Sequence, residues 1–237
     1  MSIKKGNKIQ FEKADTYLFV LLIIAILGFW PSYFSKFFDG TADFTQYIHA
    51  HATVMMLWVV FLILQPLLIR QKKLGIHSIL GKISYVLFPL VIIAGALLAH
   101  HRAEFETNIA RGLFIPFKDI VVLLVAYSIA IYYRKDVAIH ARAMIATAIP
   151  FLEPALVRFL GWSLPENFPL APYAWTILIM DLILIGLIIR ERKAKRGRWV
   201  FPLILGLYFV IQFILFSSVE IPGWKPLAEW FAALPLT

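Results

Sequence analysis

Seven long apolar segments, separated by short polar connections, constrain this chain more than any other feature of its sequence. Each segment approaches the roughly 20 residues that an α-helix needs to cross about 30 Å of hydrocarbon. Because continuous apolar spans can pair their backbone groups within lipid only as helices, the pattern predicts seven transmembrane helices. The predicted spans are about 17–34, 48–69, 76–99, 112–133, 138–160, 172–189 and 199–219.

Composition supports the same fold class. Hydrophobic residues make up 61% of the 237 residues, and the polar residues of a soluble domain could not cover so much apolar surface. The apolar runs are continuous and do not alternate, which excludes an outer-membrane barrel. The absence of cysteine excludes disulfides, thiolate-bound iron–sulfur clusters and cysteine-zinc sites. We therefore expect an all-α, polytopic membrane helix bundle that forms a single domain over residues 1–237.

The net charge of +9 is distributed unevenly. With the N-terminus placed in the cytoplasm, 17 of the 23 Lys and Arg residues fall in cytoplasmic segments, and most acidic residues fall outside. Since anionic lipid and the membrane potential hold positive residues in the cytoplasm, we predict a cytoplasmic N-terminus and an outer C-terminus. These residues flank spans, so the expected partner is the lipid bilayer of a bacterial inner membrane and not nucleic acid. The cytoplasmic basic groups are Lys4–Lys13, Arg70–Lys82, Arg134–Arg142 and Arg190–Arg198.

Prolines and the tail shape the expected bundle further. Pro116, Pro150 and Pro154 should kink spans four and five, because proline removes a backbone donor from a helix. The tail Glu220–Thr237 contains an apolar stretch around Trp230. We expect this tail to lie as a short amphipathic helix at the outer surface.

Histidines at the outer ends of two spans are the first candidate ligands. Two of them open span two and two close span three, and a short cytoplasmic loop joins these spans, so their outer ends should approach each other. One histidine from each helix would then hold a divalent metal or haem, with a carboxylate as a further ligand or proton acceptor. The alternative is a set of hydrated or lipid-facing interfacial histidines. The predicted metal-binding set is His49, His51, His100, His101, Asp119 and Glu153.

A second pair of histidines lies at cytoplasmic helix starts, His77 in span three and His140 in span five. A rise of ~1.5 Å per residue separates His77 from His100 by about 35 Å, so these two cannot share a ligand. Gly81 lies on the face of His77 and leaves room for a flat cofactor or for close helix packing. Arg142 would bind haem propionates or lipid phosphates, and the alternative for the pair is a cap at headgroup level. The predicted cofactor-binding residues are His51, His100, His77, His140 and Arg142.

Three carboxylates lie deeper in the predicted spans: Asp119 in span four, Glu153 in span five and Asp181 in span six. A lone carboxylate in hydrocarbon takes up a proton or finds a partner. We expect Lys118, Arg158 and the outer histidines to be the partners of the first two. The sequence shows no obvious partner for Asp181 in its own helix. Structural hydrogen bonding and chemistry remain equal alternatives for these acids.

Two helix starts carry short motifs. They are His77-x-x-Leu80-Gly81-x-x-x-Tyr85, and His140-x-Arg142-x-Met144 followed by Pro150 and Arg158. Over spans two to five these motifs resemble a family of bacterial multi-pass membrane proteins of uncharacterised activity. Similar helix starts occur in the CtaM-like family linked to cytochrome oxidase assembly and, more distantly, in b-type transmembrane cytochromes. The last likeness implies haem b. This chain departs from the di-haem cytochromes, because no single span carries two histidines about four turns apart.

Three functions remain open on the sequence, and it does not decide whether the protein is an enzyme. The first is a protein of respiratory electron transfer or oxidase assembly that holds haem b or a divalent metal and contacts respiratory-complex subunits. The second is a non-catalytic subunit of a membrane complex, in which the polar residues are structural. The third is a zinc-dependent membrane lipid hydrolase, in which the outer histidines, Asp119 and Glu153 hold zinc and activate water.

Overall fold

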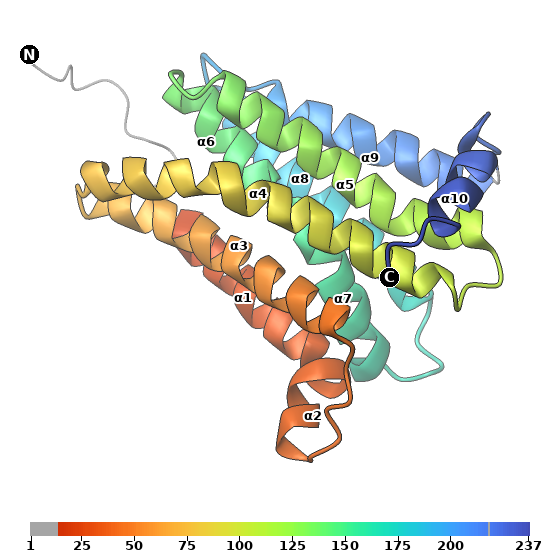
Figure 1. The fold of residues 1–237 in the computed structure, drawn as a ribbon. Helices are drawn as coiled ribbons and strands as arrows, with labels where there is room; N and C mark the ends of the chain where they lie inside the picture. Colours follow the sequence, from red (N-terminus) through yellow and green to blue (C-terminus); the bar gives the residue numbers. More distant parts are fainter. Residues whose placement is uncertain (1–13, 218) are drawn as a thin grey trace, which may run out of the picture.

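The computed structural model describes residues 14–217 and 219–237, and every regular element in that part of the chain is helical (Figure 1). Seven helical segments among these residues are long and apolar enough to cross a membrane, which confirms the predicted fold class. The elements are α1 Ala14–Phe29, η1 Trp30–Phe34, α2 Ser35–Phe38, α3 Gln46–Arg70, α4 Leu74–Ala103, α5 Ile109–Tyr132, α6 Val137–Ala146, α7 Ile149–Ser163, α8 Pro172–Glu191, α9 Val200–Ser217 and α10 Trp224–Ala232.

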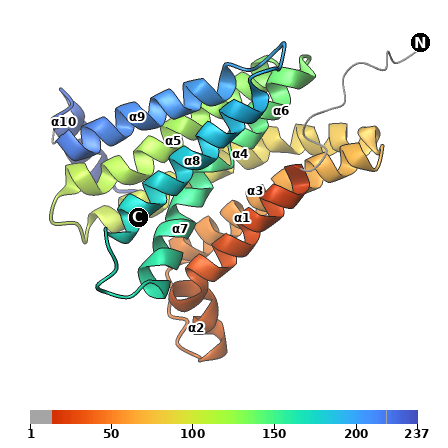
Figure 2. The same cartoon turned by 180° about the vertical axis from the view of Figure 1, so that it is seen from behind.

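Consecutive spans run antiparallel, so the bundle has two distinct ends (Figures 1 and 2). The first, called the basic end, holds the start of α1 and the connections 71–73, 133–136 and 192–199, which are rich in Lys and Arg. The second, called the α10 end, holds α2, the connections 104–108 and 164–171, and α10. The predicted basic residues Lys4, Lys5, Lys8 and Lys13 lie outside the described residues.

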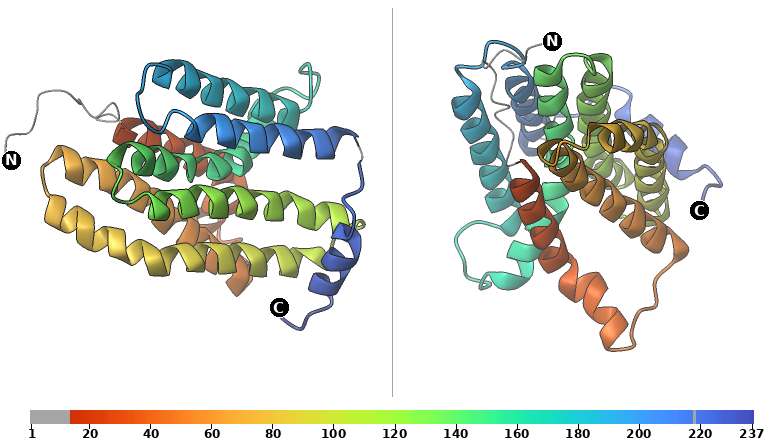
Figure 3. Two further views of the ribbon diagram at one scale, coloured as in Figure 1. Left: turned by 90° about the horizontal axis from the view of Figure 1, so that it is seen from above. Right: turned by 90° about the vertical axis from the view of Figure 1, so that its left-hand side faces the viewer.

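The helices pack around a long apolar core, and a smaller apolar cluster lies where α10 meets α4 and α5. Helices α3 and α4 form a hairpin, α1 lies against α3 and α7, and α5 lies beside α4. Figure 3 shows α4, α5 and α9 running along the bundle with α10 across their ends. Trp58 from α3, Phe88 from α4 and Tyr127 from α5 meet in the middle, and the rings of Phe88 and Tyr127 stack with centroids 3.8 Å apart. Aromatic pairs of this kind stabilise a fold beyond what the burial of their apolar area contributes.

The fifth span is two helices and not one. Helix α6 ends at Ala146 and α7 begins at Ile149, with Pro150 in the first turn of α7. Proline suits that position because the first turn of a helix has no intrahelical acceptor for its N–H groups. The expected kink near Pro150 is therefore a break, whereas α5 continues through Pro116 from Ile109 to Tyr132.

The first span and the C-terminal tail each contain a further helical element. The first span continues through the wide turn η1, which contains Pro31, and reaches Phe38, beyond the predicted end at residue 34. The expected C-terminal helix is present as α10, which packs on α5 and α4. The indole N–H of Trp224 donates to the carbonyl of Ala110 at 2.7 Å, and Phe231 meets Phe117 edge-on with ring centroids 5.1 Å apart. These contacts cover the α10 end of the bundle.

Candidate functional site

At the α10 end, the start of α3 and the end of α4 approach each other, as the short connection between the two helices predicts. The rings of Tyr47 and His101 lie 5.2 Å apart between centroids. The other histidine at the start of α3, His49, turns toward the first span, where its Nδ1 is 3.0 Å from the hydroxyl of Tyr33. Phe37 and Phe44 also face the His49 ring. His49 is thus enclosed by aromatic side chains and separated from His101.

The remaining two histidines at the α10 end have other surroundings. His100 is buried, and its Nδ1 lies 2.6 Å from Oγ1 of Thr237, while Phe231 of α10 covers the ring edge-on. His51 lies against the backbone carbonyl of Ala94, with Arg102 as a charged neighbour. Its Nδ1 is buried and has no hydrogen-bond partner among the described residues. Each histidine at this end therefore serves a different contact.

The six residues predicted to bind a metal do not gather into one site. Among the described residues, no group of three or more His, Asp and Glu side chains is placed to hold a metal ion. The physical reason is that other partners take these groups. Tyr33 contacts His49 and α10 covers His100, while the carboxylates of Asp119 and Glu153 face an ammonium.

That ammonium belongs to Lys118, and it forms the centre of a buried charged cluster. Its Nζ donates to Oδ1 of Asp119 at 2.9 Å and to both carboxylate oxygens of Glu153 at 2.7 and 2.8 Å. The side chain of Lys118 is 1% exposed, that of Glu153 6% and that of Asp119 19%. The predicted pairing with Lys118 is confirmed. Arg158, also predicted as a partner, instead donates to the carbonyl of Pro154 at 2.9 Å.

Two helices that the sequence did not connect to these acids complete the cluster. Tyr173 at the start of α8 interacts with the Glu153 carboxylate. Tyr208 of α9 lies within electrostatic range of Asp119 and Glu153, and its side chain is only 2% exposed. Gln212 of α9 donates to both oxygens of Asp181 at 3.0 and 3.2 Å, which supplies the partner that α8 itself lacks. Gln212 is a polar residue in an otherwise apolar span, and this is the sequence feature that could have identified it as the partner of Asp181.

The basic end contains a second buried ion pair. Arg142 of α6 pairs with Glu191 at the last turn of α8, and both side chains are buried. Nη1 of Arg142 also donates to the carbonyl of Ala138 at 2.7 Å. The guanidinium predicted to bind propionates or lipid phosphates is therefore engaged within the bundle. Sequence reasoning missed Glu191 because it treated the last turn of span six as a basic membrane flank.

His77 and His140 both lie at this basic end. The two imidazoles lie within electrostatic range of each other, and the ring of His77 lies against the backbone carbonyl of Gln65. Nδ1 of His140 donates to the carbonyl of Ala130 at 2.8 Å, because a carbonyl oxygen can only accept. The buried Nδ1 of His77 and both side-chain polar atoms of Gln65 have no hydrogen-bond partner among the described residues.

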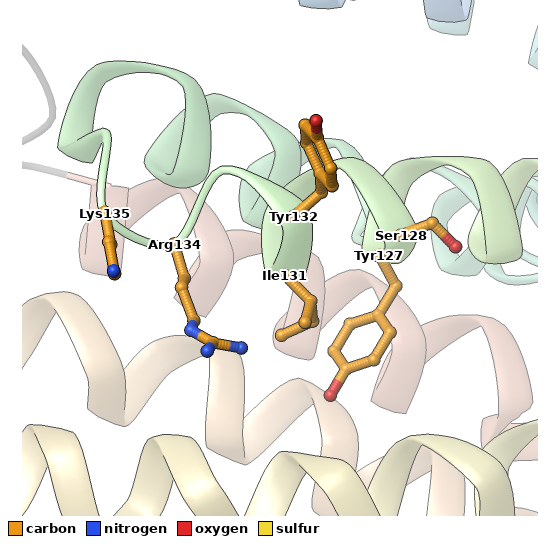
Figure 4. A pocket seen from close by; sticks show the side chains of 6 residues that line it. All are labelled: Tyr127, Ser128, Ile131, Tyr132, Arg134 and Lys135. Atoms are coloured by element: carbon orange, nitrogen blue, oxygen red, sulfur yellow. The ribbon is translucent and has the colours of Figure 1, made fainter.

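An open hollow of about 710 Å³ lies along the surface of α5 at the same end. Figure 4 shows Tyr127, Ile131 and Arg134 pointing to the same side of α5, toward α4. Contacts with α4 agree: the hydroxyl of Tyr127 is 2.9 Å from Oγ of Ser84, and Arg134 donates to the hydroxyl of Tyr85 at 3.4 Å. The lining residues are Tyr127, Ser128, Ile131, Tyr132, Arg134 and Lys135.

Helix periodicity places His77, a predicted cofactor ligand, on the same face of α4 as the residues that contact α5. His77, Gly81, Ser84 and Phe88 follow one another at spacings of three or four residues, so they form one stripe, and Ser84 and Phe88 contact Tyr127. A Cβ built at Gly81 would meet no atom within 4 Å, whereas a Cβ built at Gly95 would lie 3.7 Å from the side chain of Met55. The stripe is thus tightly packed in the middle of the bundle and open beside His77.

The seven apolar helices and the buried charged groups in the described part of the chain define the class of this protein. The chain is an integral, polytopic α-helical membrane protein with a charged cluster buried toward the α10 end and an open polar site at the basic end. Comparisons with protein-family models, with curated proteins and with solved structures found no match.

Proposed function

We propose that this protein is a bacterial inner-membrane protein that binds one haem b between His77 and His140, and that it serves respiratory electron transfer or oxidase assembly. The observation that supports the proposal is an electrostatic interaction between these two histidines, from α4 and α6, at the end of the bundle where an open hollow also lies along α5. The sequence alone placed them only at the same depth.

The donor chemistry fits haem iron. Because Nδ1 of His140 carries the proton donated to Ala130, its Nε2 keeps the lone pair that a metal needs. Histidines that ligate metals usually donate their other ring N–H to a backbone carbonyl or carboxylate, which fixes the ring orientation. An imidazole held in this way would be able to hold haem iron, and histidine is a common protein ligand of haem.

Space and charge near the pair also fit a flat, acidic cofactor. The surface beside Gly81 is unobstructed, and the hollow along α5 is open to the outside of the bundle, so a flat group could lie there. Arg134 and Lys135 lie at the hollow and carry charges suited to propionate carboxylates. Tyr127 and Phe88 close the inner side with stacked rings. A bound haem would supply one-electron chemistry, and these residues would hold it and keep water out.

The proposed orientation follows from the charges. If the basic end lies in the cytoplasm, as the positive residues favour, the haem site lies near the cytoplasmic surface and the α10 end faces outward. Respiratory-complex subunits are the proposed partners, since a single haem at one side of the membrane needs an electron donor or acceptor. The zinc-hydrolase alternative is not pursued, because the described acids and histidines form no metal-binding group.

The test is a visible spectrum of the protein purified in detergent after haem-replete expression. We expect a Soret band in the wild type and its loss in His77→Ala and His140→Ala. His49→Ala is the matched control, because its ring contacts Tyr33 at the α10 end. A wild type without a Soret band, or variants that retain it fully, would refute haem binding. Histidine variants that only lower the amount of protein would favour the non-catalytic subunit.

A further inference from the structure

The buried cluster around Lys118 has an unequal number of charges. One ammonium lies 2.7 to 2.9 Å from oxygens of two carboxylates, those of Asp119 and Glu153. With both carboxylates ionised the cluster would carry a net charge of −1, with Lys118 and Glu153 almost fully buried. An uncompensated charge in such surroundings is costly, and a carboxylate there takes up a proton or another cation.

A second observation points to the same place. The side chain of Tyr208 is 2% exposed, and its hydroxyl has no hydrogen-bond partner among the described residues. The groups that act on this hydroxyl are Asp119 from α5, Glu153 from α7 and two residues of α8, Tyr173 and Asp181. A buried hydroxyl of this kind can donate to a carboxylate or accept from a carboxylic acid.

We propose that Lys118, Asp119 and Glu153 form an intramembrane proton-binding site, which takes up and releases one proton on its two carboxylates. Tyr173 and Tyr208 line this site from α8 and α9. A proton is the ligand that the geometry favours over a metal cation. The ammonium of Lys118 already occupies the position between the carboxylates, and it would repel a second full positive charge at that distance.

The three side chains of the cluster differ in exposure. Asp119 is the most accessible of the three side chains, at 19% exposed against 1% for Lys118 and 6% for Glu153. Tyr173 stands in the first turn of α8, at the α10 end. The cluster thus lies toward the α10 end, opposite the proposed haem site. Other charged groups on that side are Arg158 of α7 and Arg102 and His51 of α4 and α3.

The test is an infrared titration of the full-length protein in lipid nanodiscs, followed through the C=O stretch of a protonated carboxylic acid. We expect a band that appears as the pH is lowered and falls to the level of other carboxyls in Asp119→Asn and in Glu153→Gln. Each of these variants leaves one carboxylate for one ammonium. Glu104→Gln, in the exposed connection after α4, is the control and should keep the band.

Lys118→Met tests the same claim from the other direction. Without the ammonium both carboxylates need a proton in the bundle, so the band should increase about twofold. A band that is absent from the wild type, or that is unchanged in all three cluster variants, would overturn the proposal. A band that sodium removes at constant pH, with choline as the reference cation, would also overturn it, because the site would then bind a metal cation. The result is independent of haem, since the His140→Ala protein should titrate in the same way.

Discussion

The two buried ion clusters of this protein differ in stoichiometry. At the basic end Arg142 faces one carboxylate, that of Glu191, so the pair is neutral. Toward the α10 end Lys118 faces two carboxylates. A balanced pair can remain ionised permanently and fix one helix against another, whereas an unbalanced cluster has capacity for a further proton. Counting charges therefore separates a structural ion pair from a candidate functional site better than burial does.

The histidines also differ between the two ends of the bundle. At the α10 end they are held apart, His49 by Tyr33 and His100 by Thr237 and α10. At the basic end His77 and His140 lie within electrostatic range, and one of them has its tautomer set by the Ala130 carbonyl. We therefore assign cofactor binding to the basic end and proton binding to the cluster around Lys118. Substitutions at the two ends should then have separate effects.

The largest expected effect separates the two ion clusters. Glu191→Gln leaves the guanidinium of Arg142 buried without its carboxylate, and breaking a buried pair from one side costs about 3–5 kcal/mol. Glu153→Gln leaves Lys118 paired with Asp119 and beside a neutral amide oxygen, so we expect a smaller loss of about 1–2 kcal/mol, as for a changed buried hydrogen bond. Reversible unfolding in mixed detergent micelles measures both. Equal losses would show that stoichiometry does not distinguish the two clusters.

The next effect concerns how α7 presents Glu153. A Cβ at Gly28 of α1 would lie 2.2 Å from the backbone oxygen of Ala155, and a backbone atom cannot move aside as a flexible side chain can. Gly28→Ala should therefore cost about 1–3 kcal/mol through overpacking and weaken the infrared band of the charged cluster. Gly186→Ala in α8 is the matched control, because a Cβ there meets nothing within 4 Å. A stable Gly28→Ala protein would contradict this α1–α7 contact.

Filling the space beside His77 gives a smaller and more selective effect. Gly81→Leu should lower haem affinity by about tenfold, which corresponds to about 1.4 kcal/mol, because the added side chain enters open space. The unfolding free energy should stay within about 0.5 kcal/mol of the wild type, as for a substitution that creates no clash. Titration of the purified apoprotein with haemin measures the first quantity. An unchanged affinity would place the haem elsewhere.

The smallest effect is expected from a charge at the hollow. Arg134→Ala should weaken haem binding by about two- to fivefold, since an exposed charge contributes about 0.2–1 kcal/mol to an ion pair. The effect should diminish at high salt, which screens exposed charges. Arg111→Ala, on an exposed residue at the start of α5 and at the α10 end, should have no effect on haem binding. Equal weakening by both substitutions would indicate non-specific attraction of haemin.

The sequence predicted the spans because an apolar run long enough to cross a bilayer has few alternatives. It also predicted the Lys118 partners, since Asp119 is adjacent and Glu153 lies at similar depth. It could not predict the Arg142–Glu191 pair, which joins helices far apart in the chain and depends on how α6 and α8 rotate. The contact of His100 with Thr237 was likewise hidden, because it requires the tail to fold back over α4. Rotation about helix axes is set by packing, and periodicity alone leaves it open in spans that are apolar all round.

The most direct test of the division between the two ends compares two histidines of α4 and α6 that both use Nδ1 in a hydrogen bond. His140 contacts the Ala130 carbonyl at the basic end, and His100 contacts Thr237 at the α10 end. The measurement is the reduced-minus-oxidised visible spectrum of His140→Ala and His100→Ala, purified in parallel with the wild type. We predict b-type bands in the wild type and in His100→Ala, and none in His140→Ala. Bands that vanish in His100→Ala and persist in His140→Ala would contradict the account.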